Sequence, residues 1–526
     1  RDVIEYEMIA CDALFTLASR YRERFVRNHL WLGEEAIRKG RDEPPYAWLV
    51  PPDQSDPGAA AHMLEILHAT GIDAHQAKAT FTADGVAYPA GTYVLLAAQP
   101  FRPHLKDMME RQEYPNRAQY PGGPPEGPYD MAGWTLPLQM GVRSVAVVSP
   151  FEADLTEATA FESYKTALNA DRASGFYVTK RTGNYDYAAV NALLDADADV
   201  RVLIEAQGDL PAGSIAVTAS DPEAWRTVWA ALAASSAKAP IRFDHIDALS
   251  AKTVSLVKPR TALYQPWTAS MDEGWTRLVL ERFEFPYETL HNAEIRAGKL
   301  RDRFDCIIIP DLRLKSLLDG HDDTVMPPPY AGGIGKDGAM ALERFVEQGG
   351  TLVLMDSATR LATDLLRVPV KDALAGVASK DFFCPGSIVR LRVDNGHPLG
   401  FGFGDEAAGF FARSQAFVTG KAALEPEKAA AKDKKDGAAA ALTDAEIEAK
   451  LEAQPVTTVV SYSDNIVLLS GWIHGADRLR NRAAVCEVAY GKGRIVLLGF
   501  RVQHRAQPWG TFKFLFNAIY WSGMGQ

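Results

Sequence analysis

The chain has 526 residues, which at roughly 150 residues per domain predicts three or four units. Hydrophobic residues make up 47% of the chain and charged residues 23%, which excludes a disordered or collagen-like protein. The formal net charge is −11, and this acidic balance argues against a protein that binds nucleic acid through clustered Lys and Arg. No run of about 18 apolar residues is present, so no membrane span is expected.

Residues 3–29 carry apolar side chains at helical spacing with charged residues between them, which predicts an amphipathic helix. Such a helix needs a partner surface. It either packs on the segment that follows or is the last helix of a missing domain. The chain begins at Arg1 without a Met or a signal-like segment, so we expect either that its start has been processed or that it is a piece of a longer protein. We expect the helix within residues 1–40 to belong to a missing amino-terminal domain.

Residues 41–142 alternate strand and helix signals and predict a small α/β module. Strands are expected at 46–50 and 93–97, a helix at 58–69 and an irregular loop at 114–128, where Pro and Gly are frequent. Residues 143–257 predict a second, mixed α/β module with strands near 145–148, 175–179 and 200–204.

Residues 258–526 predict a doubly wound α/β domain with a flavodoxin-like sheet. We expect strands at 261–264, 306–309, 351–354, 466–469, 483–489 and 494–498, and helices at 274–283 and 338–347. The segment 421–453 is almost wholly Ala, Lys, Glu and Asp. Its composition predicts an exposed, partly helical or disordered insertion, and its nearly balanced charges argue against a nucleic-acid-binding tail.

Four widely spaced cysteines form no CxxC pair, which excludes a zinc ribbon and a thioredoxin-type site. The spacing leaves one or two disulfide bridges open. Cys306 and Cys486 lie inside apolar strands and are expected to be buried. Cys384 precedes Pro385 and Gly386 in a predicted loop, so it is the cysteine we expect to be most exposed, with His397 as the nearest histidine in sequence.

His62 and Glu65 form an HxxE pair of the kind that binds zinc in carboxypeptidases. The pair lies on a predicted helix, and neither His68 nor His75 has the context of a third ligand, so a helix-surface role is the preferred interpretation. The glycines at 332, 333 and 335 lack the spacing of a phosphate-binding loop.

The strand-to-helix junction after Leu354 is where a doubly wound hydrolase places its nucleophile. Ser357 occupies that region without flanking glycines, so Asp356 and Ser357 are interpreted as a helix N-cap region. Residues 501–507 gather two Arg, two Gln and His504 after the last strand. They predict an anion or interface contact at the carboxyl end of the sheet, or a polar loop in solvent.

Several segments together resemble the region downstream of the catalytic domain in large bacterial zinc carboxypeptidases of the M14 family. The matching segments are residues 1–7, 99–100, 129–130, 134–141, 264–267, 272–275, 384–387, 471–472 and 499–507. In that family the last part is similar to a class I glutamine amidotransferase. This chain lacks the amidotransferase Cys at the junction, and His504 is followed by Arg505 and Ala506 in place of His-x-Glu, so the resemblance implies a shared fold.

The resemblance implies an accessory, non-catalytic portion of a secreted or periplasmic metallocarboxypeptidase. The zinc would be bound by a missing amino-terminal peptidase domain, which is the expected partner together with a peptide substrate. No catalytic, cofactor-binding or metal-binding residue is assigned to this chain. Two alternatives remain: an independent Cys or Ser hydrolase of amidotransferase-like fold, and a peptide- or glycan-binding module using aromatics such as Trp134, Trp267 and Trp275.

Overall fold

The computed structural model describes residues 1–161, 172–425 and 442–525. The chain is divided into two compact units. The first unit comprises residues 1–54, 60–110 and 143 to the end of its described stretch at 161. The second unit comprises residues 55–59 and 111–142 and the described residues from 172 onward.

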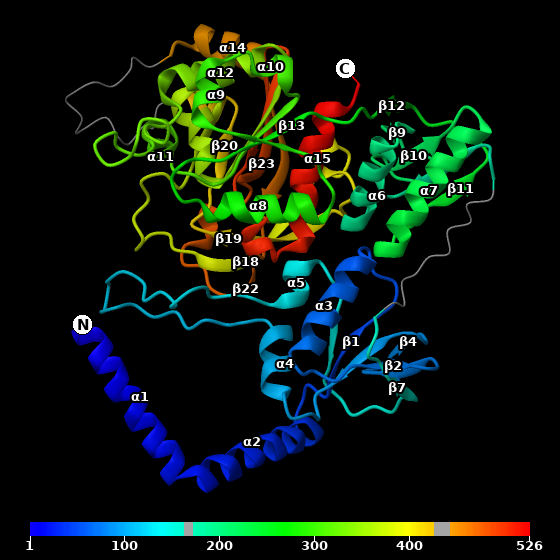
Figure 1. The fold of residues 1–526 in the computed structure, drawn as a ribbon, viewed down its shortest axis with the longest axis vertical. Helices are drawn as coiled ribbons and strands as arrows, with labels where there is room; N and C mark the ends of the chain where they lie inside the picture. The colour runs from blue at the N-terminus through cyan, green and yellow to red at the C-terminus, as the bar shows by residue number, and fades with distance from the viewer. Residues whose placement is uncertain (162–171, 426–441, 526) are drawn as a thin grey trace. The chain divides into compact units, whose positions relative to one another are not determined.

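The first unit contains a five-stranded antiparallel sheet of order β6-β1-β5-β2-β7 (Figure 1). Its strands are β1 Ala47–Val50, β2 His75–Ala77, β5 Tyr93–Leu96, β6 Val145–Val147 and β7 Leu155–Glu157, and a hairpin joins β3 Phe81–Ala83 to β4 Val86–Tyr88. Its helices are α1 Asp2–Arg20, α2 Arg22–Asp42, α4 Arg102–Met109 and most of α3 Pro57–Ala69, whose first three residues belong to the second unit. The sheet thus draws strands from both sides of residue 142.

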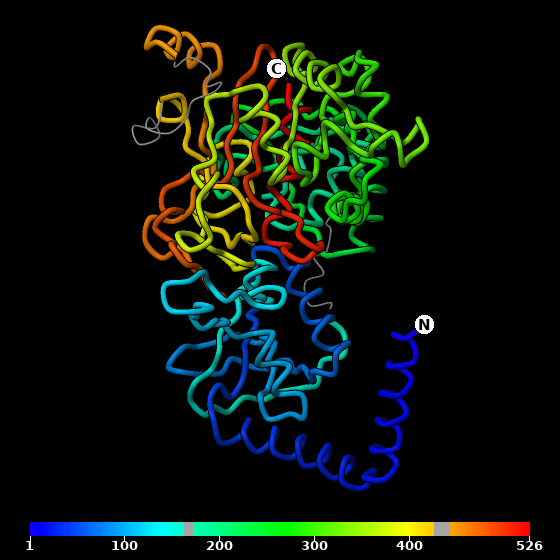
Figure 2. The backbone as a smooth tube through the Cα atoms, turned by 90° about the vertical axis from the view of Figure 1, so that its left-hand side faces the viewer, coloured from blue at the N-terminus to red at the C-terminus, as the bar shows by residue number. Residues whose placement is uncertain are grey.

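The helix expected over residues 3–29 is present as two helices that meet at Tyr21, and Figure 2 shows the bend between them. No residue of α1 is buried. Helix α2 is anchored only near its end, where Ala36 and Gly40 are buried. A Cβ atom on Gly40 would lie 2.2 Å from the carbonyl oxygen of Ala97, so only glycine permits this close approach.

The second unit contains two sheets. The smaller sheet is antiparallel, in the order β11-β8-β10-β9-β12, with strands β8 Phe176–Thr179, β9 Asp199–Leu203, β10 Ile215–Thr218, β11 Asp244–Ile246 and β12 Thr253–Ser255. Helices α6 Asn184–Asp195 and α7 Pro222–Lys238 accompany it. Together with short helix α5 Leu136–Met140, these elements precede the larger sheet in the chain.

The larger sheet has a parallel half of order β14-β13-β15-β16-β24, which is the doubly wound, flavodoxin-like arrangement expected from the sequence. These strands are β13 Thr261–Tyr264, β14 Glu288–Leu290, β15 Cys306–Ile309, β16 Thr351–Met355 and β24 Gly493–Leu498. An antiparallel half continues from β24 through β23 Ala483–Tyr490, β21 Val456–Tyr462, β18 Pro385–Val393 and β19 Glu406–Ala412. Strands β17 Val370–Asp372, β20 Phe417–Thr419 and β22 Leu468–Ser470 pair alongside it.

Helices cover both faces of the parallel half, and the α/β class is confirmed. Helices α9 Asn292–Ala297 and α12 Gly335–Glu347 pack on one face, and α8 Met271–Arg282 and α15 Phe512–Gly523 lie on the other (Figure 1). Short helices α10 Leu300–Arg303 and α11 Leu314–Asp319 lie in the connections. Helix α8 begins three residues earlier than expected, because the Ser270 hydroxyl accepts a hydrogen bond from the Glu273 N–H group.

Of the predicted insertion at 421–453, residues 426–441 lie outside the described residues. Its two ends are helical, as α13 Lys421–Leu424 and α14 Asp444–Ala453. The side chain of Ile447 is buried on the second of these helices.

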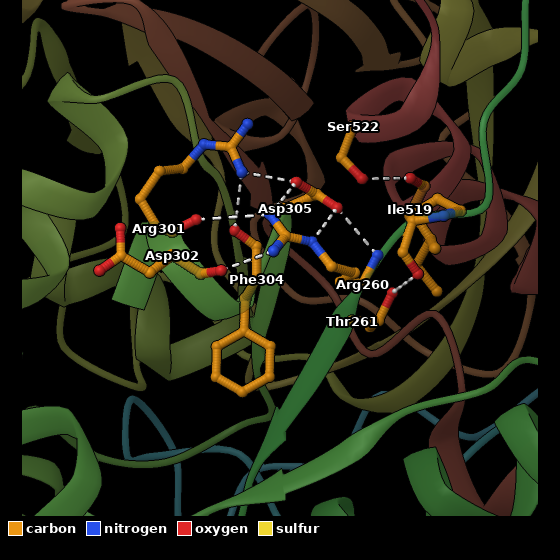
Figure 3. A network of polar contacts seen from close by, with 9 residues as sticks. Arg260, Thr261, Arg301, Asp302, Phe304, Asp305, Ile519 and Ser522 are labelled. Atoms are coloured by element: carbon orange, nitrogen blue, oxygen red, sulfur yellow. Dashed lines mark hydrogen bonds and ion pairs between the residues drawn. The ribbon is translucent and has the colours of Figure 1, made fainter. Parts of the chain in front are cut away.

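An ionic network centred on Asp305 holds the amino-terminal edge of the parallel strands (Figure 3). Asp305 directly precedes β15, and its carboxylate accepts two hydrogen bonds from the Arg260 guanidinium, at 3.0 and 2.9 Å, and one from Arg301 at 2.5 Å. The backbone N–H group of Arg260 donates a further bond at 3.0 Å. Burial alone would raise the pKa of Asp305, but the hydrogen bonds from Arg260 and Arg301 outweigh it and lower this pKa to about 2.

We expect Asp305→Ala to lower the free energy of unfolding at neutral pH by about 1 to 2 kcal/mol, allowing for solvent screening of a partly exposed pair. Because the pKa is lower in the folded state than in the unfolded state, the contribution is complete above the unfolded value and is lost as the pH falls from about 4 to about 2. Urea titrations at pH 7 and pH 3 measure the difference. The control is Asp302→Ala, since Asp302 contributes its backbone carbonyl to Arg260. Equal effects of both substitutions would contradict the assignment.

Candidate functional site

The turn after β16 places a strained residue at the carboxyl edge of the sheet. Asp356 follows the last residue of the strand and has a φ of +47°, a conformation that L-residues other than Asn, Asp and Gly rarely adopt. Its side chain accepts hydrogen bonds from the Ser414 hydroxyl at 2.7 Å and from the Gln415 amide at 3.4 Å. The N-cap interpretation of Asp356 and Ser357 is therefore wrong, because neither side chain caps the short 3-10 helix Asp356–Thr359.

Four ionisable side chains meet at this edge, and we call Asp272, Asp311, Asp356 and Arg501 the Arg501 cluster. Each comes from a different connection of the parallel sheet. Arg501 follows β24, and its Nε atom lies 3.3 Å from Oδ1 of Asp272 in the first turn of α8. Its Nη2 atom donates a hydrogen bond to Asp311, which follows β15. The other oxygen of Asp311 accepts a bond from the Ser357 N–H group at 2.9 Å.

Burial controls the protonation of the cluster. It raises the pKa of Asp356 to about 8, with the Asp311 carboxylate adding to the rise and Arg501 opposing it. Burial also raises the pKa of Asp272 to about 6. Burial alone would lower the pKa of Arg501, but the three carboxylates raise it above its usual value. At neutral pH the Asp356 carboxyl is thus mostly protonated, and Arg501 is charged.

The carboxyl group of Asp356 is protonated at neutral pH and is not placed to act as a nucleophile. Asp356 stands at the position of a hydrolase nucleophile, yet it is only 1% exposed. A buried carboxyl that is protonated at neutral pH is a weak nucleophile, and solvent does not reach it. The residues next to Asp356 are the ones that a ligand could contact. Ser357, Ser414 and Gln415 line a cavity of about 530 Å³ at this edge.

The segment 501–507 lies at the carboxyl end of the sheet, where it was expected. It is not a polar loop in solvent, because Gln503 and His504 are buried and Arg501 is engaged by carboxylates of the chain itself. Gln503 donates to the Thr276 hydroxyl at 3.0 Å. Arg505 and Gln507 are exposed, and Arg505 forms a bidentate pair with Asp130 at 2.8 and 2.9 Å.

His504 is held between aromatic rings rather than beside a nucleophile. Its ring stacks on Phe410 at 4.4 Å and meets the edge of Trp275 at 5.1 Å. Burial, with the nearby charges of Arg501 and Arg505, lowers the pKa of His504 to about 3, so the ring is neutral at physiological pH.

Two of the three expectations about cysteine burial are confirmed. Cys306 and Cys486 are buried in their strands, and burial raises the pKa of both thiols well above the usual range. The expectation that Cys384 is the most exposed is wrong, since it is 3% exposed and burial raises its pKa to about 12. Its Sγ atom lies 3.7 Å from the carbonyl oxygen of Phe411. The exposed thiol is Cys11 on α1, and all four cysteines are unbridged.

His397, the histidine nearest to Cys384 in sequence, has a different partner. Its Nε2 atom lies 3.6 Å from a carboxylate oxygen of Glu487, and its ring contacts Trp521. Burial lowers the pKa of His397, with the Glu487 carboxylate opposing this shift.

The HxxE pair is a local contact on α3. The Nδ1 atom of His62 lies 3.3 Å from Oε2 of Glu65, and the His68 ring contacts the carbonyl oxygen of Ile72. Within residues 1–161, 172–425 and 442–525, no group of three or more His, Cys, Asp or Glu side chains is placed to hold a metal ion. None of the helices in this described part has an apolar window long enough to cross a bilayer.

The glycine-rich segment before α12 is required by packing. A Cβ atom on Gly333 would lie 2.4 Å from the carbonyl oxygen of Leu317 in α11, and the Gly332 carbonyl accepts a bond from Asn292 at 2.8 Å.

The three tryptophans suggested as an exposed binding surface, Trp134, Trp267 and Trp275, are all half-buried. Trp267 stacks on His291 with ring centroids 4.1 Å apart, so its face is already occupied.

The sequence analysis did not predict that Asp272, Asp311 and Asp356 lie together around Arg501. The available signal was positional, because Asp311 and Asp356 each come directly or one residue after a buried parallel strand. Carboxyl ends of parallel strands meet at one edge of the sheet, so these acids had to lie together. Nothing in the local sequence indicated that Asp272, in the first turn of a helix, would join them.

The comparisons give distant structural likeness. No family model matches the chain, and no curated protein matches it. A cytoplasmic protein from Salmonella typhimurium is 11% identical with a TM-score of 0.30, covering 51% of this chain and 100% of its own. A putative ThuA-like protein from Bacteroides uniformis is 12% identical with a TM-score of 0.27, covering 53% and 95%. A β-galactosidase from Bacillus circulans is 9% identical with a TM-score of 0.28, covering 52% of this chain and 32% of its own.

We expect Asp356→Asn to change the pH dependence of stability. Because burial raises the folded-state pKa of Asp356 to about 8, folding is favoured by the protonated form, and this contribution is lost as the pH rises from about 4 through 8. The amide has no proton to lose and tolerates the positive φ. Relative to the native protein, the variant should therefore gain stability as the pH rises. Chemical denaturation at pH 5 and pH 8 measures this, with Ser357→Ala as the control, and a constant difference would contradict the assignment.

We expect iodoacetamide to alkylate the native protein at Cys11 alone. Cys11 is exposed, whereas the other three thiols are buried and protonated. Intact mass and peptide mapping should show one adduct, and a Cys11→Ser variant should show none. Alkylation of Cys384, or labelling of Ser357 by a fluorophosphonate probe, would instead support an independent hydrolase.

Proposed function

We propose that this chain is the non-catalytic, carboxyl-terminal portion of an M14-like zinc carboxypeptidase. Helices α1 and α2 would pack on the peptidase domain of the same protein. Zinc bound in that separate domain would activate water and polarise the scissile carbonyl for peptide hydrolysis. The proposal carries with it a secreted or periplasmic location and a peptide substrate, both implied by the family resemblance.

The observation that carries the proposal is the α1–α2 apolar surface. It consists of 14 large side chains that are 42% to 74% exposed: Val3, Ile4, Tyr6, Met8, Ile9, Leu14, Phe15, Leu17, Tyr21, Phe25, Val26, Leu30, Trp31 and Leu32. Isolated helices of this length are marginal in water, and most helical stability in proteins comes from packing. Burying one large apolar side chain contributes roughly 1.5 to 3 kcal/mol. A surface of this extent therefore calls for a protein partner.

The chemistry at the sheet edge supports a non-catalytic role. A catalytic amidotransferase domain needs a reactive thiol at the turn after β16, and here the turn holds the buried Asp356. The histidine after the last strand, His504, is neutral and enclosed by aromatic rings. These features favour an accessory domain over an independent hydrolase.

The exposed Cys11 provides the test, because it lies on α1 within the proposed contact surface. Adding the zinc peptidase domain from the same reading frame should slow the alkylation of Cys11 by about tenfold or more, as expected when most of the chain is bound. Phe15→Glu should abolish this protection, since it places a charge in the buried contact. The matched control is Val86→Glu, which changes another exposed apolar residue of the first unit.

Three outcomes would refute the proposal. The first is stoichiometric zinc binding with peptide hydrolysis by this chain alone. The second is unchanged alkylation of Cys11 at saturating peptidase domain. The third is protection that light scattering or vesicle sedimentation traces to self-association or to lipid.

A further inference from the structure

A cavity of about 530 Å³ opens at the carboxyl edge of the larger sheet, beside the strained turn at Asp356. Three connections contribute to it. The segment after β15 supplies Arg313 and Lys315, the turn after β16 supplies Ser357 and Arg360, and the segment between β19 and β20 supplies Arg413. We call this cavity the arginine pocket. Its volume lies in the range typical of small-molecule sites.

Positive charge dominates the arginine pocket, although the chain as a whole carries a net charge of −11. The side chains of Arg313, Lys315 and Arg413 have no ion-pair or hydrogen-bond partner elsewhere in the part of the chain that the structure describes. Arg360 lies near two carboxylates: its Nε atom is 3.8 Å from Asp364, and its charge also acts on Asp372. The four cations outnumber the carboxylates near them, and a bound anion would reduce the remaining repulsion between them.

One carboxylate, Asp372, also lines the pocket. It accepts hydrogen bonds from the backbone N–H groups of Leu374 at 3.0 Å and Ala416 at 3.2 Å. These bonds hold the carboxylate on the backbone of the pocket wall. The single negative charge of Asp372 does not balance the positive charges of the four Arg and Lys side chains that line the pocket.

The uncharged residues that line the pocket indicate what else a ligand would contain besides an anionic group. Ser357, Ser414 and Gln415 form a neutral polar side, and the Ser414 hydroxyl is fixed by its 2.7 Å bond to Asp356. Phe382 and Phe383 add an aromatic side. Guanidinium groups bind carboxylate and phosphate oxygens through paired, charge-assisted hydrogen bonds. A pocket lined by both cationic and aromatic side chains therefore suits an anionic group attached to an apolar body.

We propose that the arginine pocket binds a small ligand that carries a carboxylate or phosphate group. The guanidinium groups of Arg313, Arg360 and Arg413 bind the oxyanion, and Phe382 and Phe383 contact the apolar part of the ligand. The arginine pocket shares no residue with the α1–α2 apolar surface, so this proposal does not depend on the proposed peptidase partner.

Isothermal titration of the full chain at low ionic strength tests the proposal with three probes: inorganic phosphate, N-acetylphenylalanine and its neutral amide. At least one of the two anions should bind in the millimolar range or tighter, and the amide should bind at least about tenfold more weakly than N-acetylphenylalanine if the carboxylate is the recognised group. Binding of phosphate alone would identify a phosphate ligand, and binding of the carboxylate probe would identify an organic acid.

Charge-neutralising variants locate the site. The double variant R313Q/R360Q and the single variant R413Q should each weaken anion binding by about tenfold or more, since each loses a charge-assisted contact. Arg226→Gln is the matched control, because Arg226 is exposed on α7 and does not line the pocket. Unchanged melting temperatures without anion would show that the variants fold.

Two results would overturn the proposal. One is the absence of binding by both anions to the native chain at millimolar concentration. The other is equal binding of the anion by the native chain, R313Q/R360Q and R413Q, which would place the contact elsewhere on the surface.

Discussion

The carboxyl edge of the larger sheet depends on the compensation of one guanidinium by acidic groups. Arg501 would be costly to bury alone, because removing a charge from water carries a penalty of several kcal/mol. Asp272 and Asp311 contact it directly, and Asp356 lies within its electrostatic reach. Because these residues come from the connections after β13, β15, β16 and β24, the pairing fixes four chain segments in one arrangement.

The strain at Asp356 follows from the same constraint. A residue with φ of +47° persists only when its surroundings hold it, and here the carboxyl is held by Ser414 and Gln415. Since Asp356 is protonated at neutral pH, the cluster avoids three adjacent negative charges around one cation. The position that would expose a nucleophile in a hydrolase has thus become a structural anchor beneath a layer of hydroxyl and amide groups. In our proposal this layer, together with the neighbouring arginines, binds a ligand and does not react with it.

The first unit poses a separate energetic question. Its sheet buries a core of its own around Leu49, Val94 and Val147, so it does not need α1 to fold. Helix α1 leaves all of its apolar side chains in water, and its intramolecular ion pairs, such as Arg1 with Glu5, are exposed pairs that contribute little. In our proposal, contacts with the peptidase domain supply the free energy that keeps this helix folded. This is the physical basis for assigning it to an interface.

The sequence alone determined the α/β class, most of the strands and the helical character of residues 3–29, because hydrophobic periodicity and turn residues are local signals. It did not show that this stretch is divided into two helices at Tyr21. It also located residues 501–507 at the carboxyl end of a sheet. Only the tertiary structure decided that Cys384 is buried, that Asp356 rather than Ser357 takes the strained position, and that three acids surround Arg501. Burial and charge pairing join residues more than 200 positions apart, as for Asp272 and Arg501. No local pattern encodes which distant side chain will share a low-dielectric site.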